Sequence, residues 1–302
     1  MKRPIILMLL LGSITSMAQN TIAKAELEAE NVNEVRIEGS FVDVYVKSGD
    51  RVFFKGEING NGDEGDYRFD TQIVGSTLVI KVIGNRKGSW RNYRLEESRI
   101  DLTITDGVAL DIDNSSGDIK VANLRASESK IEATSGDITL RSIVANLDVE
   151  TSSGDIDIDG LIGDSDIEST SGDQDLSNLE GSIETQASSG DITITDFDGD
   201  LDIEATSGDI EIRGGEGRMK IRTTSGDIDG RNIKLTGNTY FDATSGNVDV
   251  DFSNDLDDMS FDLTASSGDL EVGNRSGEKR MVIERGGIKV IGVTSSGDQE
   301  YE

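Results

Sequence analysis

The chain has no cysteine, no histidine and one proline, and aromatic residues make up only 5% of it. Without cysteine there can be no disulfide and no lipid-modified cysteine, so the fold must depend on packing alone. Without cysteine and histidine, the commonest general base, thiol nucleophiles and the usual zinc ligands are excluded. The single proline, Pro4, leaves every later segment free to form strands that donate hydrogen bonds on both sides.

Positive charge is also scarce, with 29 Lys and Arg against 59 Asp and Glu and a formal net charge of −30. We therefore expect no nucleic-acid partner and no contact with anionic lipid, because both require clustered Lys and Arg. High acidity with few aromatics is also typical of disordered chains. The regular apolar periodicity described below favours a folded protein instead.

The first residues have the features of a secretory signal. Lys2 and Arg3 precede an apolar run that is too short to span a bilayer, and small residues lead up to Ala18. We predict a signal peptide at residues 1–18, cleaved after Ala18; an uncleaved anchor is the alternative, disfavoured because no stop-transfer flank follows. The mature chain, at a net charge of −32 after losing two positive charges, would have no transmembrane segment. It would be exported to the periplasm, the outer-membrane surface or the extracellular space.

Beyond residue 114, a Ser-Gly-Asp or Ser-Gly-Asn turn occurs ten times. Its glycines are Gly117, Gly136, Gly154, Gly172, Gly190, Gly208, Gly226, Gly246, Gly268 and Gly297. The first seven follow one another at gaps of 18 or 19 residues, and the last gaps widen to 20, 22 and 29. A fixed short period of this kind is typical of a solenoid, in which neighbouring repeats, or rungs, bury each other's apolar face.

Each rung shows two stretches of alternating apolar residues. Counted from Gly190, the apolar or small residues at +2, +4, +7, +11, +13 and +15 are Ile192, Ile194, Phe197, Leu201, Ile203 and Ala205. Alternation at spacing two indicates strands, and it occurs twice per repeat with a polar break between. The sequence therefore predicts an all-β protein, a single-stranded parallel β-solenoid (β-helix) with rungs of two strands and ~18 residues. Gln174 at a +2 position and Gly230 at a +4 position should be local dents.

The pattern divides the chain into segments. Residues 19–113 read as an irregular N-terminal β cap or irregular opening rungs, residues 114–277 as the regular Ser-Gly-Asp β-solenoid, and residues 278–302 as closing strands. We expect the sequences MVIE and IKVIGV within residues 278–293 to cover the last rung. Covered ends matter because an open edge strand is a template for aggregation.

The repeated turn allows a structural and a metal-binding interpretation. Glycine permits positive φ, and the flanking Ser and Asp can hydrogen-bond turn amides, which makes a structural role sufficient. Stacked acids would repel by roughly 1 kcal/mol per neighbouring pair, which turn hydrogen bonds or bound calcium could offset. The acidic column comprises Asp118, Asp137, Asp155, Asp173, Asp191, Asp209, Asp227, Asn247, Asp269 and Asp298. We expect no cofactor and no metal site, with a calcium-stabilised β-roll scaffold as the alternative.

Catalysis is not expected. Carboxylate pairs of the kind that cleave glycosidic bonds exist, but 59 acidic residues produce such pairs by chance. Rungs of ~18 residues also leave little room for the long loops that form a catalytic cleft. A polysaccharide-acting β-helix enzyme remains the enzymatic alternative, and we assign no catalytic residues.

One segment breaks the acidic pattern. It contains the only tryptophan and a cluster of basic and aromatic residues, Arg86, Lys87, Trp90, Arg91, Tyr93 and Arg94. Exposed aromatic and arginine side chains are typical of loops that contact a protein or an anionic glycan. The alternative is that the loop folds back on the acidic body and Trp90 plugs the cap.

The lead-in RIDLTITDGVALDIDNSSGDIKV and the SGDI rungs that follow resemble the bacterial putative-adhesin family of unknown function, which is built from Ser-Gly-Asp β-solenoid repeats. The resemblance covers residues 31 to the end and implies an exported envelope protein, with no catalytic or ligand-binding residues to transfer. We therefore expect an exported, non-enzymatic adhesin or envelope-interaction protein with an acidic, hydroxyl-rich surface. Its expected partner is a cell-surface or envelope component, a glycan or a protein.

Overall fold

The computed structural model describes residues 21–84 and 95–302. The predicted signal peptide, residues 1–18, lies outside the described residues. In those that are described, the chain forms strands β1 to β27 and one short 3₁₀ turn, η1 (Leu256–Asp258). The all-β prediction is confirmed.

The strands follow one another along the described residues, with η1 between β23 and β24. From the amino-terminal side they are β1 (Thr21–Ala29), β2 (Glu34–Glu38), β3 (Asp43–Ser48), β4 (Val52–Asn59), β5 (Tyr67–Val74), β6 (Thr77–Gly84), β7 (Arg99–Ile104), β8 (Ala109–Asn114), β9 (Ile119–Ala122), β10 (Arg125–Ala133), β11 (Ile138–Thr151), β12 (Ile156–Ile162), β13 (Ser165–Ser171) and β14 (Gln174–Glu180). They continue as β15 (Ile183–Ser189), β16 (Ile192–Asp198), β17 (Leu201–Ser207), β18 (Ile210–Arg213), β19 (Glu216–Gly217), β20 (Met219–Ser225), β21 (Ile228–Leu235), β22 (Thr239–Ser245), β23 (Val248–Phe252), β24 (Ser260–Val272), β25 (Arg275–Ile283), β26 (Lys289–Ser296) and β27 (Gln299–Tyr301).

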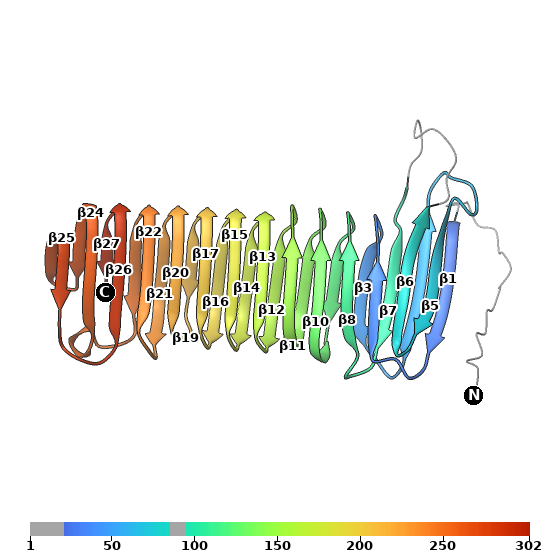
Figure 1. Cartoon of the computed structure of the whole chain (residues 1–302), viewed down its shortest axis with the longest axis horizontal. Helices are drawn as coiled ribbons and strands as arrows, with labels where there is room; N and C mark the ends of the chain where they lie inside the picture. The colour runs from blue at the N-terminus through green and yellow to red at the C-terminus, as the bar shows by residue number, and fades with distance from the viewer. Residues whose placement is uncertain (1–20, 85–94) are drawn as a thin grey trace.

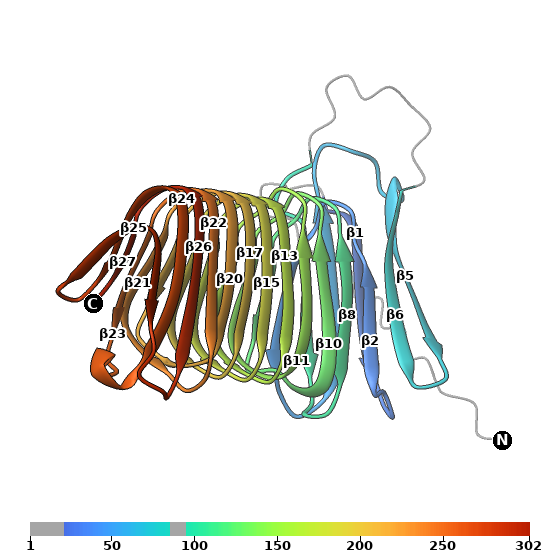
Figure 2. The ribbon, with the colours of Figure 1, turned by 60° about the vertical axis from the view of Figure 1, so that its left-hand side comes forward.

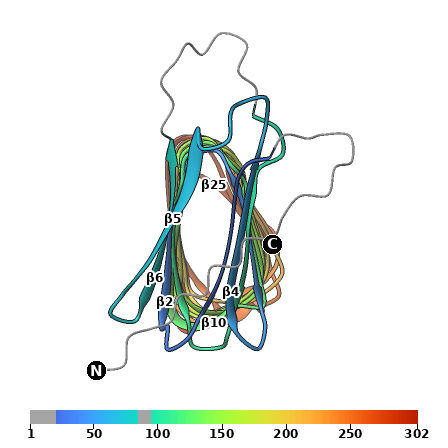
Figure 3. The same cartoon turned by 90° about the vertical axis from the view of Figure 1, so that its right-hand side faces the viewer.

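The central strands stack side by side along an elongated rod (Figure 1). End on, they form two faces that enclose a narrow interior (Figure 3). Face A contains β8, β10, β13, β15, β17, β20 and β22, and face B contains β9, β12, β14, β16, β18, β21 and β23; β11 crosses from face B to face A. In the regular rungs each strand pairs in parallel with the strand 18 residues on, as in the series Ile156, Gln174, Ile192 and Ile210.

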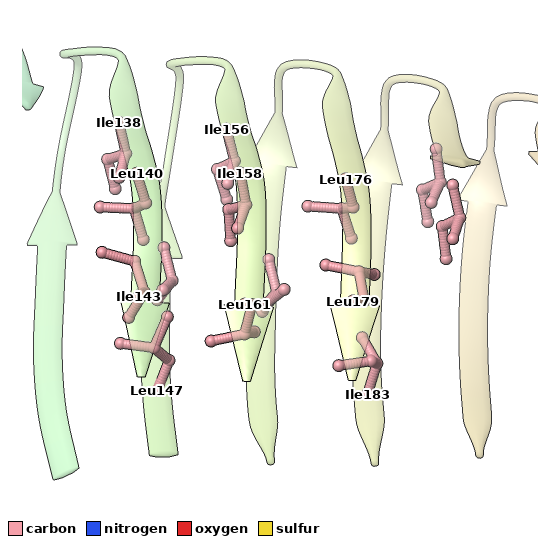
Figure 4. Packing of buried hydrophobic residues seen from close by; sticks show 14 of the residues in the cluster. Ile138, Leu140, Ile143, Leu147, Ile156, Ile158, Leu161, Leu176, Leu179 and Ile183 are labelled. Atoms are coloured by element: carbon pink, nitrogen blue, oxygen red, sulfur yellow. The ribbon is translucent and has the colours of Figure 1, made fainter. Parts of the chain in front are cut away.

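The interior is a column of aliphatic side chains. Ile138, Leu140 and Ile143 of one rung lie beside Ile156 and Ile158 of the next, all pointing inward (Figure 4). Each of these side chains is at most 1% exposed. Full burial of one such residue contributes about 1.5–3 kcal/mol, so the stack of rungs is held mainly by this column.

The corner turns require glycine because neighbouring rungs approach closely there. Gly208 has φ of 139°, and a Cβ built on it would lie 2.0 Å from the carbonyl oxygen of Gly190. The same contact recurs along the column of Ser-Gly-Asp turns. A methyl group at this position would therefore separate two rungs as well as strain the backbone.

A second column of left-handed residues was not predicted. It lies six residues after successive corner glycines, has φ values from 56° to 81°, and comprises Asn123, Ser142, Gly160, Asn178, Asp196, Gly214 and Asn232. The positions +4 and +7 both face inward although they are an odd number of residues apart. One residue in a bulge conformation restores the alternation, and Asn, Asp and Gly tolerate that conformation best.

The sheet is mixed at its amino-terminal end, so a single parallel coil does not describe the whole chain. β2 pairs in parallel with β6 and β8, and β3 with β7 and β9. Outside them, β5 is antiparallel to β6, β4 to β7, and β1 to β4. These antiparallel strands cover the first rungs, because short turns can join antiparallel neighbours directly.

The carboxy-terminal rungs are not stacked in the order of the sequence. β26 pairs with both β22 and β24, and β27 with both β23 and β24, so residues 289–301 lie between the two preceding rungs. β25 is antiparallel to β24 and lies outside it. Of the two sequences expected to cover the far end, MVIE lies partly in this outer strand, whereas IKVIGV is internal.

Gln174 is not a dent. Its side chain is fully buried; Nε2 donates to Ser169 Oγ at 2.9 Å and to the Gln186 carbonyl at 2.8 Å, and Oε1 accepts from the Thr185 hydroxyl. Gly230 does mark an irregularity, because the ladder from β21 to β23 shifts register after it. The space beside Gly230 is filled by Ile233 and Val250, each 2.8 Å from the position of a Cβ.

Candidate functional site

The acids of the Ser-Gly-Asp turns form a continuous ladder of hydrogen bonds. Each side-chain Oδ1 accepts the backbone N–H of the corresponding acid in the next rung, at 2.7 to 3.3 Å from Asp43 to Asp269. Asn247 takes the same place with its amide oxygen. The ladder gives these carboxylates a structural role between rungs, whereas the sequence predicted a role within each turn.

The ladder does not form a recognisable metal centre. Across residues 21–84 and 95–302, no group of three or more Asp or Glu side chains is arranged to hold a metal ion. Each carboxylate from Asp43 to Asp298 in the ladder already has an amide donor to offset the repulsion of its neighbours, and Asp269 ends the ladder with its N–H. The calcium-stabilised scaffold stays an alternative prediction.

Face A carries a groove of about 330 Å³, which we call the trough, near the Ser-Gly-Asp corner. One wall is a column of long polar side chains, Glu150, Glu168, Gln186, Glu204, Arg222 and Asp242. The other wall is a column of hydroxyl side chains, Thr170, Ser188, Thr206, Thr224 and Thr244. The floor between them consists of small residues, Thr151, Ser169, Ala187, Ala205 and Thr223.

The trough follows from the strand period. Its walls lie two residues apart on each strand, so both point outward, while the floor residue between them points inward. The polar wall repeats in six consecutive rungs and the hydroxyl wall in five of them, and six rungs at ~4.8 Å spacing give a length of about 24 Å. The recurring sequence Ala-Thr-Ser-Gly contains the signal for the hydroxyl wall, although from the sequence it indicated only a corner.

The trough is electrostatically uneven along its length. At one end, burial raises the pKa of Glu168, and the neighbouring carboxylates of Asp166 and Glu150 raise it further. None of these three acids forms an ion pair within the described part of the chain. At the other end, Arg222 lies 2.6 Å from Glu204 and neutralises it.

A second groove, of about 550 Å³, runs along the bend between the faces. Left-handed Asn178 and Asp196 form part of its rim, and Val144 and Ile162 add apolar surface. Ile162 is 50% exposed. This groove is larger and less polar than the trough, and its column of polar left-handed residues is interrupted by Gly160.

The predicted partner-contact loop lies between β6 and β7 in the sequence. Its residues Arg86, Lys87, Trp90, Arg91, Tyr93 and Arg94 all lie in the segment 85–94, outside the described residues. Their contact with a partner, or with the cap, stays a prediction. No helix in the described part of the chain is both long and apolar enough to cross a membrane.

Comparison with known proteins gives a family match. The family model described as Toastrack DUF4097 matches residues 32–213 and 197–300. No curated protein matches the chain.

Several solved structures are similar in architecture at low sequence identity. A putative adhesin from Parabacteroides distasonis ATCC 8503 is 13% identical with a TM-score of 0.49, covering 92% of this chain and 95% of that one. A putative adhesin from Bacteroides fragilis NCTC 9343 is 13% identical with a TM-score of 0.44, covering 94% and 98%. A putative lipid binding protein from P. distasonis ATCC 8503 is 17% identical with a TM-score of 0.44, covering 92% and 96%.

Proposed function

The chain belongs to the Toastrack DUF4097 family, and we propose that it is an exported, non-enzymatic adhesin-like protein that binds an extended glycan in the trough. The observation that carries this proposal is the repetition, over five rungs, of one hydroxyl wall beside one wall that consists mainly of carboxylate and amide side chains. A site that repeats along a rod matches a ligand that is itself a repeating polymer.

The chemistry of the two walls suits sugars. Hydroxyls such as those of Thr206 and Thr224 both donate and accept, and carboxylates such as Glu168 accept from sugar hydroxyls. A chain of β-linked hexoses advances by a distance close to the spacing of the rungs, so successive sugars would meet equivalent residues. The parallel β-solenoid expected from the sequence would provide the rigid scaffold for this arrangement, and the 18-residue pairing offsets support it.

Charge narrows the class of glycan. Net charge of −30 and the unpaired acids around Glu168 repel acidic polysaccharides. We therefore expect uncharged glycans and glycans that carry amino groups to bind, and acidic ones to bind poorly. The predicted signal at residues 1–18 supports a location in the periplasm, on the outer-membrane surface or outside the cell.

The proposal is tested by blocking the trough. Thr206 is exposed on the hydroxyl wall, so the side chain of Thr206→Phe should fill the trough. The strand should tolerate this substitution, because aromatic residues are common on strand surfaces. Thr195→Phe, on an outward position of face B, is the matched control. On an array of neutral, amino and acidic glycans, the affinity of Thr206→Phe should be lower by about tenfold or more. This is the effect expected from the loss of one or two hydrogen bonds. Equal binding by both variants would overturn the trough as the site.

The same array separates the enzymatic alternative. Release of reducing ends from a bound polysaccharide would overturn the non-enzymatic assignment and favour a polysaccharide-acting enzyme. The basic loop is tested separately by Trp90→Ala with Arg91→Ala. Lost binding with an unchanged melting temperature supports a contact loop, whereas lost stability supports the cap.

A further inference from the structure

The two ends of the rod expose open strand edges. At the amino-terminal end of face A, β5 pairs only with β6 within the described residues, and at the other end β25 pairs only with β24. Figure 2 shows these two strands at opposite ends of the rod. An edge strand presents unpaired backbone N–H and C=O groups that can extend a sheet.

The same two strands carry most of the exposed apolar side chains. Among the described residues, four large hydrophobic side chains are exposed, and three of them lie on these edges. Ile73 on β5 is 40% exposed, Val74 on β5 is 60% exposed, and Val282 on β25 is 48% exposed. Isolated exposed aliphatics are ordinary on a protein surface. Their presence on both open edges is what favours contact between the edges.

The charges of the two ends are opposite in sign. The outer strand β25 carries exposed Arg275, Lys279 and Arg280 against one acid, Glu278, in a chain of net charge −30. At the other end, the exposed bases Lys24 and Arg68 are outnumbered by exposed acids on or beside β1 and β5, namely Glu26, Glu28, Glu30, Asp63, Glu64 and Asp70. Unlike ends therefore attract, and like ends repel.

Strand direction is compatible with stacking in one orientation. On face A, β5 runs antiparallel to the rung strands, and so does the second half of β25. A second copy placed on the same axis would therefore bring β25 and β5 together in parallel. The apolar residues Ile73, Val74 and Val282 all lie near the end of their strand, so the same stacking places them at the same level.

We propose that this chain assembles head to tail with further copies of itself, with β25 of one copy pairing with β5 of the next. Contact between two different ends of a molecule does not close on itself, so the product is an open filament. Repetition of the trough along such a filament would raise avidity for a polymeric ligand. The assembly does not depend on the glycan, so it can hold or fail independently of the proposed function.

The experiment measures the mass of the purified chain by sedimentation over a range of concentrations, at low and at high salt. We expect weight-average mass to rise with concentration at low salt and to fall towards the monomer at high salt, since salt screens exposed charges. Lys279→Glu with Arg280→Glu, and separately Glu30→Lys with Asp63→Lys and Glu64→Lys, should each give monomers, because each makes the two ends alike in charge. Arg213→Glu with Lys234→Glu, in the middle of face B, should leave assembly unchanged.

The decisive test mixes the two end variants. Each variant has ends that repel its own copies, but its ends attract those of the other, so the mixture should regain the assembly of the unmodified chain. Circular dichroism of each variant confirms that it is folded. A monomer at every concentration and salt, or a mixture that stays monomeric while both variants are folded, would overturn the proposal.

Discussion

The carboxylate of Asp191 accepts the backbone N–H of Asp209, one rung further along, at 2.8 Å. In turn, the N–H of Asp191 is bound by Asp173 at 2.9 Å. The acid of each Ser-Gly-Asp turn is thus an acceptor for a different rung from its own. The column of like charges is tolerated because each member satisfies an amide that would otherwise be unpaired at a corner.

We expect Asp191→Ala to lower the free energy of unfolding by about 1 kcal/mol, because the N–H of Asp209 loses its acceptor. Asp191→Asn should be close to neutral, since Asn247 already fills this role with its amide oxygen at 2.9 Å. Urea denaturation of the two variants measures the difference. Equal losses in both would show that the charge itself, and not the hydrogen bond, is required.

We expect Gly208→Ala to destabilise the chain by about 3 kcal/mol, the combined cost of a left-handed backbone and of overpacking. A Cβ there would lie 2.0 Å from the Gly190 carbonyl oxygen. Gly107→Ala is the control, because Gly107 has φ of 86° but no atom within 4 Å of a Cβ. It should cost about 1 kcal/mol. Similar losses for both variants, measured by denaturation, would contradict close contact between rungs at the corner.

The sequence predicted those features of the fold that are determined within a single rung. Ile192 and Ile194 alternate with polar residues in a way that only a half-buried strand explains, and both are fully buried. The glycine at each corner could be predicted equally well, because it recurs at a nearly fixed spacing in the sequence. The hydroxyl wall containing Thr206 was visible as a repeated residue, but its role as one side of a trough depends on a second column on the same face.

The sequence could not predict what depends on contacts between distant rungs. The order of the repeats predicts that β24 follows β22 in the stack. In the structure, residues 289–301 lie between these two strands. In the sequence, only the wider gaps after Gly226 indicated an irregularity. Gln174 resembled a defect because its partners, Ser169, Thr185 and Gln186, lie on the opposite strands of the coil.

We expect Gln174→Leu to lower the free energy of unfolding by about 2 kcal/mol, because the Thr185 hydroxyl and the Gln186 carbonyl lose a buried partner. Adding Thr185→Val should recover about 1 kcal/mol, because the double variant leaves fewer unpaired polar groups in the core. A double-mutant cycle by urea denaturation measures this coupling. Strictly additive losses would mean that the two side chains act independently.

We expect calcium to raise the melting temperature no more than magnesium at the same concentration. The ladder carboxylates already have amide donors, and the described residues contain no cluster suited to a metal. Both ions should therefore act only by screening the net charge of −30. A rise specific to calcium that disappears in Asp191→Asn with Asp209→Asn would establish the calcium-stabilised alternative.

We expect Glu168→Gln to stabilise the chain by about 0.5 kcal/mol at neutral pH, the size of a cross-strand repulsion that it removes. Burial and the neighbouring acids Asp166 and Glu150 raise the pKa of Glu168 above its ordinary value of 4.5. The folded chain therefore binds this proton more tightly than the unfolded chain does. As pH rises through the window between the ordinary and the raised pKa, the unmodified chain loses stability.

The advantage of Glu168→Gln should accordingly be present above that window and disappear below pH values near 4.5, where Glu168 is neutral in both states. Glu204→Gln is the matched control, because Glu204 pairs with Arg222 at 2.6 Å in the same column. It should lower stability at neutral pH where Glu168→Gln raises it. Urea denaturation at a series of pH values measures both, and an advantage of Glu168→Gln that persists in acid would show that repulsion at the trough is not its cause.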